Sequence, residues 1–216
     1  MSKRLKIDFV SDVSCPWCVI GLGGLEEALR RVGTLVHADI HFQPFELNPG
    51  MPPEGQNIAE HLAQKYGASR EQSAANRKAI QDRAAQVGFG IAINDESRIY
   101  NTFDAHRLLH WAGLEGRQSA LKRALFEAYF TDGQNVADTE VLAAAAEKAG
   151  LDGGAAREVL RSGRYTDEVR EAERRWREAG VSSVPAIVIN DRYLISGGQA
   201  PETFERALRA IASEAS

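Results

Sequence analysis

Cysteine is scarce in this chain, with two residues among 216. A chain of this length buries about 70% of its unfolded surface, so its core needs no disulfide staples. No apolar stretch approaches a membrane span, and the N-terminus lacks the apolar segment and cleavage site of a signal peptide. The net charge is -4 and no basic run is present, which argues against nucleic-acid and anionic-membrane partners. We therefore expect no nucleic-acid or membrane partner and a reducing, cytoplasmic location.

Both cysteines lie in one short motif, Cys15-Pro16-Trp17-Cys18. Two thiols at this spacing can close a disulfide within one helical turn and reopen it by exchange. In a reducing compartment such a pair is rarely a structural bridge. The motif therefore predicts a redox pair, with half of a zinc site or two reduced core thiols as the alternatives.

The residues around the motif predict a strand that leads into a helix. Apolar residues alternate with polar ones from Leu5 to Val10, which is typical of a strand. From Leu22 to Val32 the apolar residues recur at helical spacing, and Gly33 follows as a stop signal. Cys15 is thus expected at a helix N-terminus, where the helix dipole and free N–H groups stabilise a thiolate.

The rest of the chain changes from strand to helix and back. An alternating run around Ile40 and Phe42 predicts a second strand, followed by a Pro-rich loop at Asn48. Helical patterns then cover Ile58 to Tyr66, Ser69 to Val87, Asn101 to Ala112, Gln118 to Phe130, Thr139 to Ala149, a shorter stretch from Gly154, and Thr166 to Ala179. Strands at Ala186 to Ile189 and Arg192 to Ile195, joined by an Asn-Asp turn, precede a helix after Pro201.

This order of elements resembles the DsbA-like branch of the thioredoxin fold, in particular its FrnE-type cytosolic subgroup. The matching strings are Cys15 to Cys18, Asn101 to Arg107, Val181 to Pro185 and Gly197 to Gln199. The resemblance implies an α/β thioredoxin fold with an inserted all-helical domain. Residues 1–53 and 164–216 would form the thioredoxin-like domain, and residues 54–163 the insert. Some members of the subgroup carry further C-terminal cysteines, which this chain lacks.

The predicted activity is thiol-disulfide exchange, as an oxidoreductase or isomerase on protein or small-molecule disulfides. Cys15 would be the nucleophile, and the more deeply placed Cys18 would attack the resulting mixed disulfide. No bound cofactor is expected beyond the Cys15–Cys18 disulfide itself. The partners would be disulfide-bearing proteins or thiols, together with an external reductant such as glutathione or a thioredoxin system. Glutathione is also a candidate co-substrate.

Five further residues are candidate substrate-binding positions. Pro16 sets the helix entry, and Trp17 offers an apolar surface beside the reacting sulfur. The resemblance implies a cis bond between Val184 and Pro185, with the backbone of Val184 presented to an extended substrate opposite Cys15. His106 lies on a helix that could bring an imidazole near the cysteines. Because Trp17 cannot stabilise a thiolate as a histidine within the motif does, we predict a less oxidising pair than in the DsbA relatives that carry one.

Several alternatives remain. A glutathione-dependent isomerase or transferase, of the 2-hydroxychromene-2-carboxylate isomerase or kappa-class type, resembles this architecture but typically has serine in place of Cys15. His106 and His110 have the spacing of a metal pair and could complete a Cys2His2 site, although we expect no metal because Pro185 would occupy the same side of the sulfurs. Asp8 and Asp12 are candidate proton acceptors for Cys18. Asn48 and its loop are a candidate rim of a substrate groove.

Overall fold

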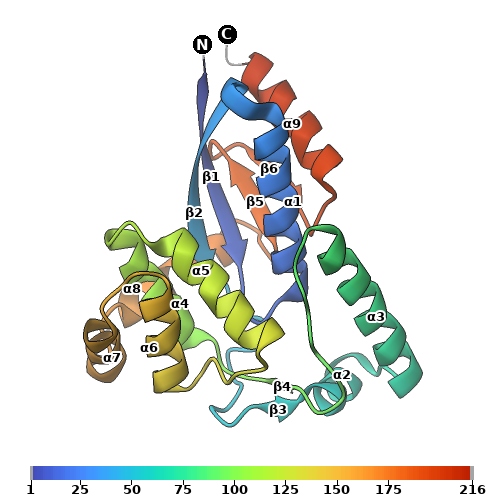
Figure 1. Ribbon diagram of the computed structural model, residues 1–216, viewed down its shortest axis with the longest axis vertical. Helices are drawn as coiled ribbons and strands as arrows, with labels where there is room; N and C mark the ends of the chain where they lie inside the picture. The colour runs from blue at the N-terminus through green and yellow to red at the C-terminus, as the bar shows by residue number, and fades with distance from the viewer. Residues whose placement is uncertain (1, 215–216) are drawn as a thin grey trace.

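A computed structural model describes residues 2–214. Within them, four strands form one mixed sheet in the order β2-β1-β5-β6 (Figure 1). The strands are β1 (Lys3–Ser11), β2 (Val36–Pro44), β5 (Ala186–Ile189) and β6 (Tyr193–Ser196). β1 pairs with β2 in parallel and with β5 antiparallel, and β5 and β6 are also antiparallel. β1 is a central strand, so both its faces are covered: Ile7, Phe9 and Val10 are all fully buried.

Two helices pack together along this sheet. They are α1 (Pro16–Val32), which follows the cysteine motif, and α9 (Pro201–Glu214) at the end of the chain (Figure 1). Their close approach depends on Gly24, where a Cβ atom would lie 2.6 Å from the carbonyl oxygen of Gln199. A larger residue at this position would force α1 away from the segment that leads into α9.

The helices of the middle of the chain form the helical lobe, which lies beside the end of α1 where the cysteine motif begins (Figure 1). The helices of the lobe are α2 (Ile58–Tyr66), α3 (Arg70–Gln86), α4 (Phe103–Leu114), α5 (Gln118–Phe126), α6 (Thr139–Lys148) and α7 (Gly153–Ser162). Of these, α4 to α7 lie on one side of that end of α1, and α2 and α3 lie on the other (Figure 1). Helix α8 (Thr166–Glu178) follows the lobe in the chain and packs against both β2 and α4. Shorter elements are the 3-10 turn η1 (Gly33–Leu35), the π-helical turn η2 (Glu127–Thr131), and the paired strands β3 (Gln56–Asn57) and β4 (Arg98–Ile99).

The helical pattern of the sequence agrees with most of these bounds. Ser69 and Gln72 form the reciprocal capping box that their spacing indicates. The predicted helix from Gln118 to Phe130 is the main correction, because α5 ends at Phe126 and the chain continues as a π-helical turn. β3 and β4 were not predicted, since two-residue strands show no alternation.

The hydrophobic core of the described residues is continuous between the sheet and the helical lobe. One buried cluster includes Phe9 and Phe42 of the sheet together with Phe126 and Phe130 of the lobe. Gln118, the first residue of α5, also pairs with edge strand β2. It accepts the N–H of Phe42 at 2.9 Å and donates to the carbonyl oxygen of Phe42 at 3.0 Å. The predicted domain boundaries at 53/54 and 163/164 therefore lie within a shared core, and they remain a prediction.

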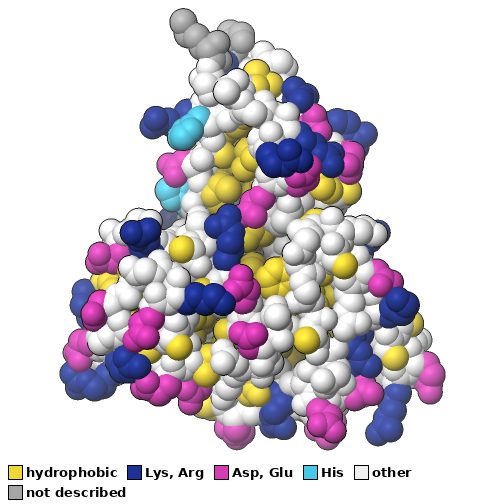
Figure 2. Space-filling view, in the orientation of Figure 1, with side chains coloured by type: hydrophobic (Ala, Val, Ile, Leu, Met, Phe, Trp, Pro, Cys, Tyr) yellow, Lys and Arg dark blue, Asp and Glu magenta, His cyan; other side chains and the backbone are white. Residues whose placement is uncertain are grey.

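The outer surface carries charges of both signs. On the face in Figure 2, Lys and Arg side chains are interspersed with Asp and Glu side chains and form no large basic patch. Within residues 2–214, no helix is both long enough and apolar enough to cross a membrane.

Candidate redox site

The cysteine motif begins helix α1. Cys15 is the N-cap residue, with an extended backbone (φ -92°, ψ 112°), and Pro16 occupies the first turn of the helix. Proline suits this place because the first N–H groups of a helix have no partner within the helix. Both cysteines are free thiols. Cys15 is 3% exposed and Cys18 is fully buried one turn further on, so Cys15 is the sulfur nearer to solvent.

The carbonyl of Val184 faces the first cysteine. The Cys15 thiol donates to the carbonyl oxygen of Val184 across 3.6 Å. The peptide bond between Val184 and Pro185 is cis. Pro185 itself lies over α1, because a Cβ atom on Gly21 would come within 3.0 Å of the Pro185 Cγ atom. The fold thus places the Val-Pro turn against the first turns of α1.

The glycine turn at Gly197 and Gly198 packs against both the Val-Pro turn and the cysteine motif. Gly197 adopts a left-handed φ of 81° and donates its N–H to the carbonyl oxygen of Pro185 at 2.8 Å. A Cβ atom on Gly198 would lie 2.7 Å from the carbonyl oxygen of Trp17. Trp17 keeps 38% of its surface exposed beside the motif. Cys15, Pro16, Trp17, Val184 and Pro185 are thus all neighbours in space, although their roles remain predictions.

Burial strongly affects the second cysteine. The pKa of Cys18 is raised well above its ordinary value, first by burial and then by hydrogen bonding and charge from Cys15. The positive charge of Lys122 and the backbone N–H of Asp12 oppose this effect without reversing it. Cys18 is therefore a protonated thiol at neutral pH, so it must lose a proton before it can attack a disulfide.

Asp12 is a buried carboxylate that organises the loop before Cys15. It accepts the N–H of Ser14 at 3.3 Å and the N–H of Leu47 at 2.7 Å. Burial alone would raise the pKa of Asp12. Contact with His106, supported by Leu47 and Thr102, instead holds the pKa below its ordinary value. Asp12 thus stays ionised and ties the cysteine loop to the segment after β2.

Asp8, His106 and His110 each make different contacts. Asp8 is engaged by Lys6 at 3.0 Å and by Gln43 at 2.6 Å. His106 is 3% exposed, and its Nε2 atom lies 3.5 Å from the Asp12 Oδ1 atom. At this distance the contact is electrostatic, and Nε2 makes no hydrogen bond within the described structure. His110 packs against Tyr165, with 5.0 Å between the ring centroids and the rings tilted by 36°. His106 therefore meets the cysteine loop through Asp12.

The metal alternative has no geometric support in the described residues. No group of three or more His, Cys, Asp or Glu side chains among residues 2–214 is arranged to hold a metal ion. The two histidines with metal-pair spacing, His106 and His110, make the separate contacts described above.

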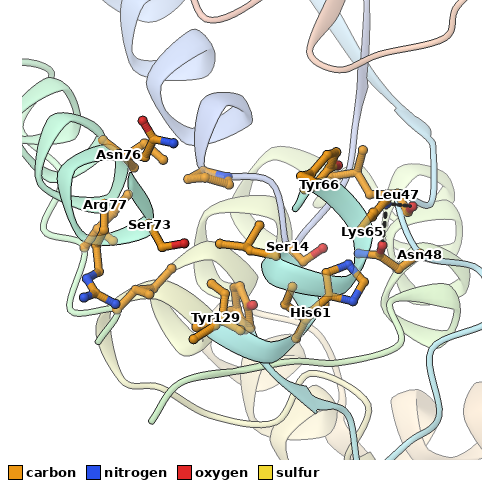
Figure 3. Close-up of a pocket in the computed structure, with 18 residues that line it drawn as sticks. Ser14, Leu47, Asn48, His61, Lys65, Tyr66, Ser73, Asn76, Arg77 and Tyr129 are labelled. Carbon is orange, nitrogen blue, oxygen red and sulfur yellow. Dashed lines mark hydrogen bonds between the residues drawn. The ribbon is translucent and has the colours of Figure 1, made fainter. Parts of the chain in front are cut away.

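A pocket of about 170 Å³ opens beside the motif. Ser14, Pro16 and Asn48 line it on the motif side, and the labelled side chains in Figure 3 surround it from α2, α3 and the loops. Its far walls are mainly apolar, with Ile58, Leu62, Ile80, Ile91, Ile93 and Ile99. Lys65 also lines the pocket, and its Nζ donates to the carbonyl oxygen of Leu47 at 3.1 Å and to the Asn48 side chain at 2.8 Å. The Asn48 loop thus lines this pocket, and its place at a substrate groove stays a prediction.

Sequence reasoning missed Lys122 of α5. This lysine is fully buried and interacts electrostatically with both cysteines and with Asp12. A signal was present, because Leu121, Leu125 and Phe126 place Lys122 on the apolar side of its helix. Lysine is almost never fully buried unless it is paired with another group. A lysine on the apolar face of a helix is therefore a candidate functional residue.

The comparisons with known proteins agree with this arrangement. Residues 6–209 match the family model of the DSBA-like thioredoxin domain. A probable DsbA oxidoreductase from Streptomyces coelicolor is 36% identical, with a TM-score of 0.89 over 97% of this chain and 91% of that one. The two chains therefore share the same overall fold.

Two more distant structures show the same fold. The 2-hydroxychromene-2-carboxylate isomerase structure is 18% identical, with a TM-score of 0.72 and coverage of 97% of both chains. The cytosolic disulfide reductase DsbM from Pseudomonas aeruginosa, in a structure with GSH, is 18% identical, with a TM-score of 0.62 over 96% of this chain and 98% of that one. With its cysteine pair at the start of α1 and a family match over nearly its whole length, this chain belongs to the DSBA-like thioredoxin domain family.

Proposed function

We propose that this protein is a thiol-disulfide oxidoreductase or isomerase that acts through the Cys15–Cys18 pair on protein or small-molecule disulfides. The observation that carries the proposal is the position of the two sulfurs. Cys15 lies at a helix N-terminus against the Val184 carbonyl, and Cys18 lies fully buried behind it. Cys15 is thus placed to react first, with a substrate disulfide, and Cys18 is placed to react second, with the Cys15 sulfur.

The proposed exchange takes two steps. The Cys15 thiolate attacks one sulfur of a substrate disulfide, which forms a mixed disulfide and releases the first substrate thiolate. Cys18 then loses its proton and attacks the Cys15 sulfur. The Cys15–Cys18 disulfide forms, and the second substrate sulfur leaves with the electron pair. The substrate is reduced by two electrons, the protein is oxidised by two, and an external dithiol or glutathione restores the thiols.

The surroundings support an extended substrate beside Cys15. Trp17 offers exposed apolar surface, and the turn at Val184 and Pro185 offers backbone groups for an extended chain. The apolar pocket bordered by Ser14 and Pro16 would receive a side chain or the non-peptide part of a small thiol. His106 would act on this site through Asp12, without touching the substrate.

A single-turnover experiment tests the proposal. Reduced protein is mixed with dithiobis-nitrobenzoate, a disulfide that releases a coloured thiolate, and the release is followed by stopped flow. The wild type should release two equivalents, one for each step. Cys18→Ser should release only the first and keep a mixed disulfide detectable by mass. Cys15→Ser should lose the fast first step and also the reduction of insulin. Insulin reduction by Cys15→Ser at the wild-type rate would remove the proposal.

A glutathione-dependent isomerase or transferase is the second candidate. It is favoured by the fold shared with 2-hydroxychromene-2-carboxylate isomerase over nearly the whole of both chains. It is disfavoured by Cys15, because that class typically has serine at this position. Calorimetry separates the two functions. Tight glutathione binding to Cys15→Ser, together with isomerase turnover by that variant, would favour the alternative.

We further propose a cytoplasmic location and membership of the FrnE-type subgroup. The string Asn101 to Arg107 and the helical lobe support the subgroup, although this chain lacks the further C-terminal cysteines that some members carry. The support for the reducing cytoplasm is a redox pair with no other cysteine in the chain. Measuring the Cys15–Cys18 reduction potential against glutathione tests the direction of exchange. A value near that of thioredoxin would indicate a reductant, and a much higher value an oxidase or isomerase.

A further inference from the structure

Lys122 is a buried charged group that the two-step scheme above does not use. Its side chain is fully buried in α5, and its Nζ atom has no hydrogen-bond partner among the residues that the structure describes. Nζ lies 4.7 Å from the ring centroid of Phe126 and 5.9 Å from that of Phe42. The aromatic faces give an ammonium weak support but cannot take its protons in hydrogen bonds. Burying an amine without a hydrogen-bond partner costs folding free energy. A residue that is kept at this cost is a candidate for a functional role.

The surroundings of Lys122 connect it to the redox pair. Phe42, which it contacts, packs on Phe9 of β1, the strand that leads into the cysteine motif, at 5.6 Å between ring centroids. The charges and thiols that interact with the amine are Cys18, Asp12 and Cys15, in decreasing order. Burial, opposed by these three groups, lowers the pKa of Lys122 to about 8. At pH 7 about a tenth of the amine is therefore neutral, and this fraction is able to accept a proton.

The same lysine also borders a route to solvent. A hollow of about 510 Å³ is lined by the buried Lys122 and His106, by His110 of α4, and by the exposed Glu168, Glu171 and Arg175 of α8. His41 of β2 lies on its wall. Water in this hollow can carry a proton away from the amine to bulk solvent.

We infer that the Lys122 amine accepts the proton of the Cys18 thiol when Cys18 attacks the mixed disulfide on Cys15. This role rests on the proposed function and completes its second step. The Cys18 S–H bond breaks and its proton passes to Nζ, which becomes an ammonium. Because Nζ makes no hydrogen bond within the described structure, this transfer requires a movement of the lysine side chain or one bridging water. The Cys18 sulfur bonds to the Cys15 sulfur, and the substrate sulfur leaves with the electron pair. The ammonium then returns its proton to solvent through the hollow beside His106.

Asp12 is less suited to this task. Its carboxylate already accepts the N–H groups of Ser14 and Leu47 and faces His106. These contacts hold the pKa of Asp12 low, which makes the carboxylate a weak base. Toward Cys18, Asp12 offers its backbone N–H. The base that the resolving step needs therefore comes from the helical lobe and not from the sheet.

The test is the stopped-flow experiment with dithiobis-nitrobenzoate, run from pH 6 to pH 9 with Lys122→Met. The first release, which reports Cys15, should change less than twofold. The second release, which reports Cys18, should slow at least tenfold at pH 7, and its pH midpoint should rise because no internal base remains. Lys78→Met, at an exposed lysine of α3 paired with Asp82, is the matched control and should leave both phases unchanged.

The outcomes separate the two proposals. If the wild type lacks the first phase, or does not release one equivalent of thiolate in it, the proposed redox function itself is wrong. A normal first phase with a second phase in Lys122→Met that keeps the wild-type rate and pH midpoint would overturn the role of Lys122 and leave the redox function standing. Lys122→Gln, which keeps a polar end on the side chain, replaces Lys122→Met if the latter does not fold, and the same slowing of the second phase is expected.

Discussion

At the scale of single residues, burial of the Lys122 ammonium lowers the stability of the folded protein. The lowered pKa of Lys122, caused first by burial, means that the folded chain holds the ammonium less well than the unfolded chain does. Below pH 8 the amine is largely charged in both states, so folding must bury the charge. As the pH rises from about 8 toward 10.5, the folded state loses this proton first, and the cost disappears.

Lys122→Met should therefore be more stable than the wild type at pH 7, by about 1 to 3 kcal/mol in the free energy of unfolding. The gain should shrink as the pH approaches the ordinary lysine pKa of 10.5. Urea denaturation at pH 7 and pH 10 measures both values. A variant that is destabilised at pH 7 would mean that packing of the lysine chain, rather than its charge, governs this position.

At the scale of elements, α8 is attached to the rest of the molecule by a cluster of buried charges. Glu173 of α8 accepts the backbone N–H of Glu46, which follows β2, at 2.9 Å. Arg170 binds the carboxylates of Glu46 and Glu173 and stacks its guanidinium on Phe103 of α4 at 3.7 Å from the ring centroid. Burial, and then the charge of Glu173, raises the pKa of Glu46. Arg170 is the cation that offsets two buried carboxylates.

Arg170→Met should lower the free energy of unfolding by about 1 to 3 kcal/mol at pH 7, a range reduced for the 47% exposure of the arginine side chain. A carboxyl group with a raised pKa is least costly when it is protonated. The loss should therefore shrink as the pH falls toward 5. Arg174→Met, whose partner Glu171 is exposed, is the control and should change stability by less than about 0.5 kcal/mol. A loss of equal size at both pH values would contradict the electrostatic explanation.

At the scale of the whole molecule, the helical lobe and the sheet share one core. Gln118 ties α5 to β2, and the aromatic residues of both parts belong to the same buried cluster. Lys122 interacts electrostatically with the cysteine pair across this junction. The catalytic scheme therefore needs the lobe to be in place, not only the thioredoxin-like part.

We predict that the two parts unfold together in urea. Trp111 lies in α4 of the lobe, whereas Trp176 packs with Val10 against the sheet. One variant keeps only Trp111 (Trp17→Phe, Trp176→Phe), and another keeps only Trp176 (Trp17→Phe, Trp111→Phe). In each variant, the fluorescence midpoint should equal the midpoint from far-UV circular dichroism, since a continuous core unfolds cooperatively. If each single tryptophan instead departs from the circular dichroism midpoint, residues 54–163 form an independently folding insert.

Much of the fold could be predicted because its signals are local. The alternation in β1, the helical spacing in α1 and the capping box at Ser69 all depend on neighbours within a few residues. The break in the predicted Gln118 to Phe130 helix was not visible, because a π-helical turn has the same composition as the helix that it ends. The paired strands β3 and β4 are held by contacts between distant segments, so no local pattern marks them.

The sequence by itself determined the elements, the pair of thiols and their place at a helix N-terminus, because spacing along the chain sets each of these. Only the tertiary structure decided what surrounds the thiols. It brought the Val184 carbonyl to Cys15, placed His106 beside Asp12, and buried Lys122 where it interacts with Cys18. The pKa of a buried group depends on the solvent it loses and the charges it meets. Both are set by segments that are far apart in the chain and come together only in the fold.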